Sequence, residues 1–187
     1  MQIANLIAEK LLLSEHEKEV LYYAAMIHDA GMCSISKEIL EAPRKLTDEE
    51  MKKLREHVST IETIIKGRVD DEVLEVVAAH HERLDGSGYP KRLKDSQMTR
   101  LQKILQVADT MTALTSKRSY RETKPKDTVI AILKEEGDRG RLSREVIRVV
   151  IANYDEIMEK VKTRSDNMLA MYHKLLDSYE KTSRAFK

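Results

Sequence analysis

Apolar residues recur along most of this chain at three- and four-residue intervals, the spacing of one helix face. Two of the stretches begin with a capping box, in which Ser14 precedes Glu17 and Thr47 precedes Glu50. Glycine and proline number only 6 and 3 in 187 residues, so few positions interrupt the pattern. The pattern predicts an all-α protein with helices over residues 2–12, 14–31, 36–40, 47–65, 71–82, 100–115, 126–136 and 143–160.

The C-terminal stretch carries its own apolar stripe. Residues 164–187 have apolar side chains at helical spacing, namely Met168, Tyr172, Leu175 and Tyr179, widened by Leu169 and Leu176. We therefore expect two parts, a domain over residues 1–162 and a long amphipathic helix over residues 163–187. This helix either packs on its own domain or pairs with another helix, in a homodimer or with a sensory or receiver domain.

Charge and cysteine content narrow the class of protein. Lys and Arg (33) nearly balance Asp and Glu (32), giving a formal charge of +1, which argues against a protein that binds DNA or RNA duplexes. No run of about 18 apolar residues is present, and the N-terminus has no signal-peptide pattern, so no membrane association is expected. Cys33 is the single cysteine and has no internal partner for a disulfide. These features predict a cytoplasmic protein.

Side chains that can bind metal or exchange protons are most concentrated in residues 80–90, His-His-Glu-Arg-Leu-Asp-Gly-Ser-Gly-Tyr-Pro. An apolar helical stretch leads into His80 and His81, and the glycines and proline that follow end the helix. Taken alone, such a pair is more often one core histidine and one exposed histidine. Further candidate ligands elsewhere in the chain change this interpretation.

Four predicted helices each contribute histidine or aspartate at or near an apolar stripe. Asp109 interrupts such a stripe and needs a partner, because an unpaired buried carboxylate is costly. A helical bundle can bring these side chains into one site, and mixed imidazole and carboxylate ligands suit Fe, Mn or Zn but not Ca. The candidate ligands of a two-metal site, with Asp29 as the natural bridge, are His28, Asp29, His57, His80, His81 and Asp109.

At this point the chain resembles the HD-GYP branch of the HD metal-dependent phosphohydrolases. The resemblance covers roughly residues 3–160 and rests on four motifs: His28-Asp29, the string at 80–90, Val107-Ala108-Asp109, and Arg118-Ser-Tyr-Arg121. It implies a compact helical bundle of the HD-domain type. It also implies a bacterial signalling enzyme that hydrolyses cyclic di-GMP to linear pGpG and/or GMP.

Family roles carry over by matching position. The six candidate ligands correspond to the family's metal ligands, for two divalent ions that are expected to be Fe or Mn, with Zn as an alternative. Asp29 would thereby be catalytic as well as a ligand, because paired metals activate a water for in-line attack on phosphorus. Tyr89, Arg118 and Arg121 correspond to groups that hold the substrate phosphates.

Three departures from the family pattern leave alternatives open. Met32 stands where the family has a phosphate-binding lysine, and Ile61 stands where it has a glycine, which could shift the His57 ring. Residues 3–13 resemble the segment that follows a further family histidine, so that ligand is expected to be lacking. The enzyme interpretation is favoured. The alternatives are a degenerate nucleotide-binding or protein-interaction module, and a phosphodiesterase for another cyclic dinucleotide such as cyclic GMP-AMP.

Overall fold

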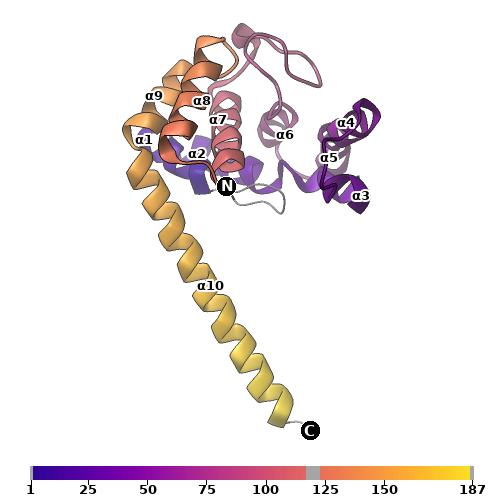
Figure 1. Ribbon diagram of the computed structural model, residues 1–187, viewed down its shortest axis with the longest axis vertical. Helices are drawn as coiled ribbons and strands as arrows, with labels where there is room; N and C mark the ends of the chain where they lie inside the picture. The colour runs from indigo at the N-terminus through magenta and orange to yellow at the C-terminus, as the bar shows by residue number, and fades with distance from the viewer. Residues whose placement is uncertain (1, 117–122, 186–187) are drawn as a thin grey trace. The chain divides into compact units, whose positions relative to one another are not determined.

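The computed structural model describes residues 2–116 and 123–185, and its regular secondary structure in these ranges is helical apart from one β-bridge between Asp85 and Lys94 (Figure 1). This confirms the predicted all-α class and the long C-terminal helix. The α-helices are α1 (Gln2–Lys10), α2 (Glu15–Ile27), α3 (Lys37–Leu40), α4 (Asp48–Arg55), α5 (His57–Ile65), α6 (Asp71–Ala78), α7 (Arg100–Thr115), α8 (Lys126–Asp138), α9 (Arg144–Ala152) and α10 (Tyr154–Ala185). Two short 3-10 turns are η1 (Ala30–Ser34) and η2 (Asp95–Gln97).

Helix α7 is the central element of the helical bundle. It packs against α1, α2, α6, α8 and α9, and Figure 1 shows it between α8 and α6. Its buried residues are mostly apolar, with Ile104, Val107 and Met111 all inaccessible to solvent. Burying side chains of this size contributes roughly 1.5–3 kcal/mol each. This helix therefore anchors the bundle, and Asp109 is carried on it.

Helix starts agree closely with the sequence signals. Ser14 and Thr47 each accept a hydrogen bond from the backbone amide three residues on, and Glu17 and Glu50 bond back, so both expected capping boxes are present. A third box, Thr99 with Gln102, starts α7. Such caps satisfy backbone amides that have no partner within the helix.

Three helix ends differ from the sequence-based expectation. The expected ends at Gly31 and residue 82 are replaced by ends at Ile27 (α2) and Ala78 (α6). The helix expected over 47–65 does end at Ile65, but it is interrupted at Glu56, so that α4 ends at Arg55. At each of these ends a histidine ring contacts the carbonyl three residues before it, which occupies an acceptor that the next helical amide would use. The three histidines are His28, His57 and His80.

The chain separates into two compact units, residues 1–152 and 153–187. The second unit is essentially α10, which joins two stretches that the sequence pattern had separated near residue 162. Tyr154 and Ile157 near its start are buried, whereas the large apolar side chains from Met168 onward are exposed, including Tyr172, Leu175 and Tyr179. Among the described residues, no helix combines the length and the apolar content needed to cross a bilayer.

Candidate metal centre

Asp29 is placed between two sets of ligand atoms. It follows directly after α2, where the chain turns into η1, and its side chain remains about half exposed. Its Oδ2 lies 3.4 Å from His28 Nε2, while its Oδ1 lies 3.7 Å from His57 Nε2 and 3.9 Å from His80 Nε2. The two oxygens of one carboxylate thus face different histidines, which is the arrangement of a bridging ligand.

The histidines of α5 and of the turn after α6 form the buried side of the centre. His57 and His80 are fully buried, and their Nε2 atoms lie 3.3 Å apart. The His81 ring lies against both, with ring centroids 4.1 Å from His80 and 5.1 Å from His57. His80 and His81 therefore converge on one site because the helix has already ended at Ala78.

Backbone carbonyls orient three of the rings. The Nδ1 atoms of His28, His57 and His80 lie 3.0, 2.6 and 2.6 Å from carbonyl oxygens of the preceding turn. A carbonyl only accepts, so each Nδ1 carries a proton and donates it, and Nε2 is the atom that each ring presents to the centre. The three rings are thus oriented with Nε2 as the atom that would bind a metal ion.

The six candidate ligands form two groups that share Asp29. One ligand atom from each of Asp29, His57, His80 and His81 lies within 4.8 Å of the others, and the same holds for His28, Asp29 and Asp109. A nitrogen-rich group and a carboxylate-rich group joined by one carboxylate fit a pair of transition-metal ions. On this chemistry the residues present fit the dinuclear site that the sequence suggested.

Burial and charge set the proton occupancy of these groups. Burial lowers the pKa of His80 to about 4, and burial together with the neighbouring His80 lowers the pKa of His81 to about 3, so both rings are neutral at pH 7. Burial also lowers the pKa of His28, but hydrogen bonds to Asp109 and Asp29 outweigh it and raise that pKa to about 9. Burial raises the pKa of Asp29, and the adjacent His28 reverses this and holds it well below its usual range.

The loop after the two histidines is built around a buried carboxylate. Glu82 is fully buried and accepts hydrogen bonds from the backbone amides of Lys91 (2.5 Å) and Leu93 (2.9 Å). Gly88 packs so closely on this turn that a Cβ there would lie 2.3 Å from the Arg83 nitrogen. Asp85 closes the intervening turn by accepting from the Ser87 amide at 2.9 Å. These contacts fix where Tyr89 lies.

A cavity of about 350 Å³ opens onto the centre. Tyr89 lines it, with its ring centroid 4.9 Å from that of His81, and burial raises the pKa of its hydroxyl to about 12, so it stays a hydrogen-bond donor. The lining residues are Asp29, Met32, Leu54, His57, His81, Arg83, Tyr89, Asp109, Thr110, Ala113 and Leu114.

The structure brings seven of the nine sequence-predicted site residues together, namely the six candidate ligands and Tyr89. The other two, Arg118 and Arg121, lie outside the described residues. Ile61 packs beside Gly31, and the His57 ring is within the cluster. Sequence reasoning missed Glu82, Arg83 and Arg55. Glu82 and Arg83 lie inside the conspicuous string, whereas no sequence signal marked Arg55.

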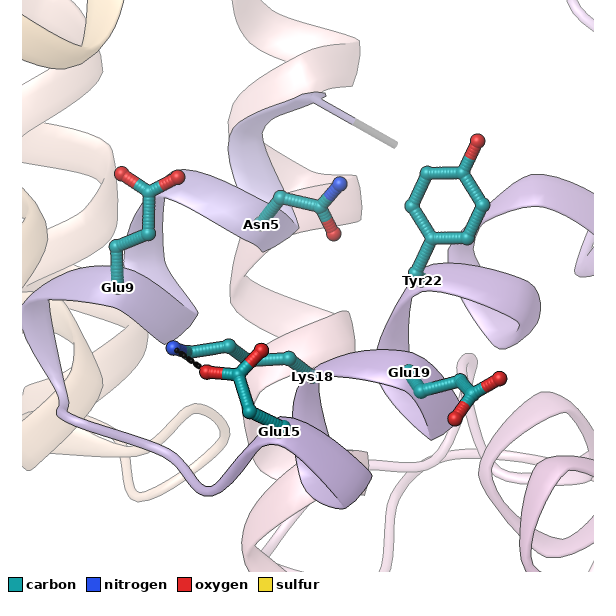
Figure 2. A pocket seen from close by; sticks show the side chains of 6 residues that line it. All are labelled: Asn5, Glu9, Glu15, Lys18, Glu19 and Tyr22. Atoms are coloured by element: carbon teal, nitrogen blue, oxygen red, sulfur yellow. Dashed lines mark hydrogen bonds and ion pairs between the residues drawn. The ribbon is translucent and has the colours of Figure 1, made fainter.

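A second hollow, of about 430 Å³, lies between α1 and α2 and shares no residue with the centre (Figure 2). Lys18 pairs with Glu15 at 2.7 Å, and Figure 2 draws this pair together with the other lining residues, Asn5, Glu9, Glu19 and Tyr22. It has no histidine, so it adds nothing to the metal-ligating groups.

Comparisons with known proteins agree with this geometry. A family model described as the HD domain matches residues 1–146. The chain is 38% identical over 144 residues to the cyclic di-GMP phosphodiesterase response regulator RpfG of Xanthomonas campestris, covering 75% of this chain and 37% of that protein. It is 35% identical over 132 residues to the 3'3'-cGAMP-specific phosphodiesterase 3 of Vibrio cholerae, covering 70% and 29%.

A similar protein and a similar structure extend the match. The chain is 34% identical over 169 residues to a cyclic di-GMP phosphodiesterase of Thermotoga maritima, covering 88% of this chain and 45% of that protein. The structure of Bd1817, a HDG"Y"P protein from Bdellovibrio bacteriovorus, superposes with a TM-score of 0.67 at 19% identity, over 82% of this chain and 49% of that chain. The chain thus spans less than half the length of each of these relatives.

Proposed function

The chain belongs to the HD-GYP branch of the HD domain family, and from this premise we propose that it is a metal-dependent phosphodiesterase of cyclic dinucleotides. The reaction is hydrolysis of cyclic di-GMP to linear pGpG and/or GMP in bacterial second-messenger signalling. The observation that carries the proposal is the position of Asp29, whose two oxygens face the two halves of the ligand cluster.

The residues divide the work in a defined way. Asp29 joins the two positions, His57, His80 and His81 complete one, and His28 and Asp109 complete the other. When bound, two divalent ions supply Lewis acidity, which activates a water and neutralises charge on the scissile phosphate. Fe or Mn suits this donor set best, and Zn is the next candidate.

The chain's own groups then orient the substrate. Tyr89, fixed by the Glu82 loop beside His81, donates its hydroxyl proton to a phosphate oxygen. Arg118 and Arg121 are assigned to the substrate phosphates, because a guanidinium offers two parallel donors to two oxygens. The cavity beside the centre keeps the reacting phosphate against the metal positions.

A second substrate, a 3'3'-cyclic GMP-AMP, is favoured by a specific observation. A relative 35% identical to this chain is named for that substrate. Both substrates carry two phosphodiesters, so the same centre serves either. The bases alone distinguish them.

The deciding experiment measures bound metal and turnover together. Protein purified without added metal is analysed for metal content, then assayed with Fe(II) or Mn(II) on cyclic di-GMP and on 3'3'-cyclic GMP-AMP, with products separated chromatographically. About two metals per chain together with linear product is the expected result. Bound metal without turnover of either substrate would instead indicate a degenerate binding module.

We also propose that α10 pairs with α10 of a second copy. Met168, Tyr172, Leu175 and Tyr179 follow one another at intervals of four, three and four residues, the spacing of a coiled-coil seam, and all four are exposed. A helix that buries little surface is marginal in water by itself, and pairing supplies the missing burial.

We also propose a cytoplasmic location, since Cys33 is a free, exposed thiol that a reducing compartment preserves.

A further inference from the structure

The described part of the chain brings little positive charge to the cavity beside the metal centre, for a substrate with two phosphates. Its lining, as far as the structure describes the chain, contains one cationic side chain besides the histidine ligands, Arg83. Met32 and Leu54 make the neighbouring wall apolar. A pair of metal ions at the centre would neutralise the scissile phosphate, which leaves a second phosphodiester charge to be bound.

Arg83 is held in place by the loop that carries Tyr89. It is half-buried, and one guanidinium nitrogen donates to the Glu82 carbonyl at 2.8 Å. Its backbone is fixed as well, because Gly88 packs directly on its amide nitrogen. Arginine has five N–H donors, so one bond to a carbonyl leaves others for a phosphate.

A second guanidinium reaches the same place from α4. The Arg55 guanidinium carbon lies 5.0 Å from the centroid of the Tyr89 ring, within the range of a cation–π contact. Arg55 is exposed to solvent, yet this contact holds its charged end over the ring that lines the cavity. Helix α4 and the loop after α6, which are far apart in sequence, therefore both place guanidinium groups near Tyr89.

We propose that Arg83 and Arg55 together bind a substrate phosphate beside Tyr89, and so supply the charge that Met32 does not. This inference rests on the proposed phosphodiesterase function. Planar guanidinium groups bind phosphate oxygens in pairs, and a site that keeps one arginine half-buried and the other stacked loses little side-chain entropy on binding. The chemistry recognised is a phosphodiester, independent of the bases attached to it.

The test compares Arg55→Gln and Arg83→Gln with a matched control, Lys53→Gln, which removes an exposed charge from the same helix as Arg55. Each arginine variant should raise KM for the cyclic dinucleotide about tenfold while kcat stays within about twofold, as expected for a contact made equally in the ground and transition states. Metal content and melting temperature should match the wild type. The dependence of KM on salt should weaken in both arginine variants and stay unchanged in the control.

Arg55→Lys separates binding from packing, because lysine keeps the charge but lacks the planar fork and should restore KM only in part. An unchanged KM and salt dependence in both Gln variants would overturn the inference. If the wild-type protein turns over no cyclic dinucleotide, the proposed function fails. Calorimetric binding of linear pGpG then tests the phosphate-binding role of the two arginines separately. About tenfold weaker pGpG binding in both Gln variants supports that role, whereas equal binding in the variants, or no binding by the wild type, overturns it.

Discussion

The Nε2 atoms of His57 and His80 lie 3.3 Å apart in the buried part of the centre. Each ring places Nδ1 against a carbonyl oxygen, so Nε2 is the atom that both rings present to the centre. The fold therefore holds two imidazole nitrogens where one cation would contact both.

Removing the carboxylate of Asp29, which both ligand groups share, should lower the number of bound metal ions more than removing the unshared carboxylate of Asp109. Asp29→Ala should lose both ions and all turnover, because Asp29 belongs to both ligand groups. Asp109→Ala should retain one ion, since the group containing His57 keeps all its members. Metal per chain by mass spectrometry, with the exposed Asp127→Ala as control, distinguishes the two. Two ions retained by Asp29→Ala would contradict the bridging role.

Metal binding should release a proton from His28. Asp109 and Asp29 raise the pKa of His28 to about 9 in the metal-free protein, so the ring is protonated at pH 7 and must lose its proton to bind metal. We expect about one proton released per chain at pH 7, and metal affinity that rises with pH up to about 9. His80 and His81 are already neutral there and add none. Calorimetry in two buffers of different ionisation enthalpy measures the release, which His28→Gln should abolish.

Met32→Lys should increase kcat/KM by about tenfold, from about 1.5 kcal/mol for a new charge-assisted hydrogen bond to substrate phosphate. Met32 lines the cavity and is only half-buried, so a lysine there reaches the cavity without a large burial cost. Steady-state kinetics on both cyclic dinucleotides provides the measurement. Unchanged kinetics would mean that position 32 makes no contact with a substrate phosphate.

Glu82→Gln should destabilise the protein by about 1–3 kcal/mol, because one of two backbone amides would then face an N–H donor in place of an oxygen. KM should also rise, since the same loop positions Tyr89. Urea unfolding gives the first quantity. Glu62→Gln is the matched control: its carboxylate pairs with the Lys91 side chain at the surface, at 3.4 Å, and its loss should change stability by less than about 1 kcal/mol. Equal effects of the two changes would contradict the role given to Glu82.

A chain ending at Lys162 should be monomeric in solution while the full chain is dimeric. The truncation removes the exposed stripe that includes Met168, Tyr172 and Leu175, and leaves the residues of the metal centre intact. Light scattering measures the two masses, and metal content confirms that the shortened protein folds. A monomeric full chain would mean that the stripe serves a different partner, such as a sensory or receiver domain.

Local signals in the sequence predicted the helix starts well and the helix ends poorly. The capping boxes at Ser14 and Thr47 act within four residues, so the sequence displays them directly. The ends at Arg55 and Ala78 depend on histidine rings that turn back onto carbonyls, a choice that apolar periodicity does not record. A continuous helix over 47–65 was therefore predicted in place of α4 and α5.

The candidate ligands were predicted because histidine and aspartate are conspicuous next to apolar stripes, and the structure gathers all six. Arg55 was not predicted as a site residue, because in the sequence an exposed arginine on a charged helix resembles any solvated residue. Only the fold places the Tyr89 ring next to it. Contacts between segments distant in sequence are the part that pattern alone does not supply.

The buried contacts of Glu82 and Gly88 bear on how inactive relatives of this chain are recognised. Both residues serve the folding of the loop and touch no reacting atom, so selection for stability preserves them even after catalysis has been lost. Glu82 and Gly88 within the string at 80–90 therefore report that this loop is folded, and not that the protein is active. Active and inactive copies of this domain are better distinguished by the metal-ligand positions, such as 28, 57, 80, 81 and 109.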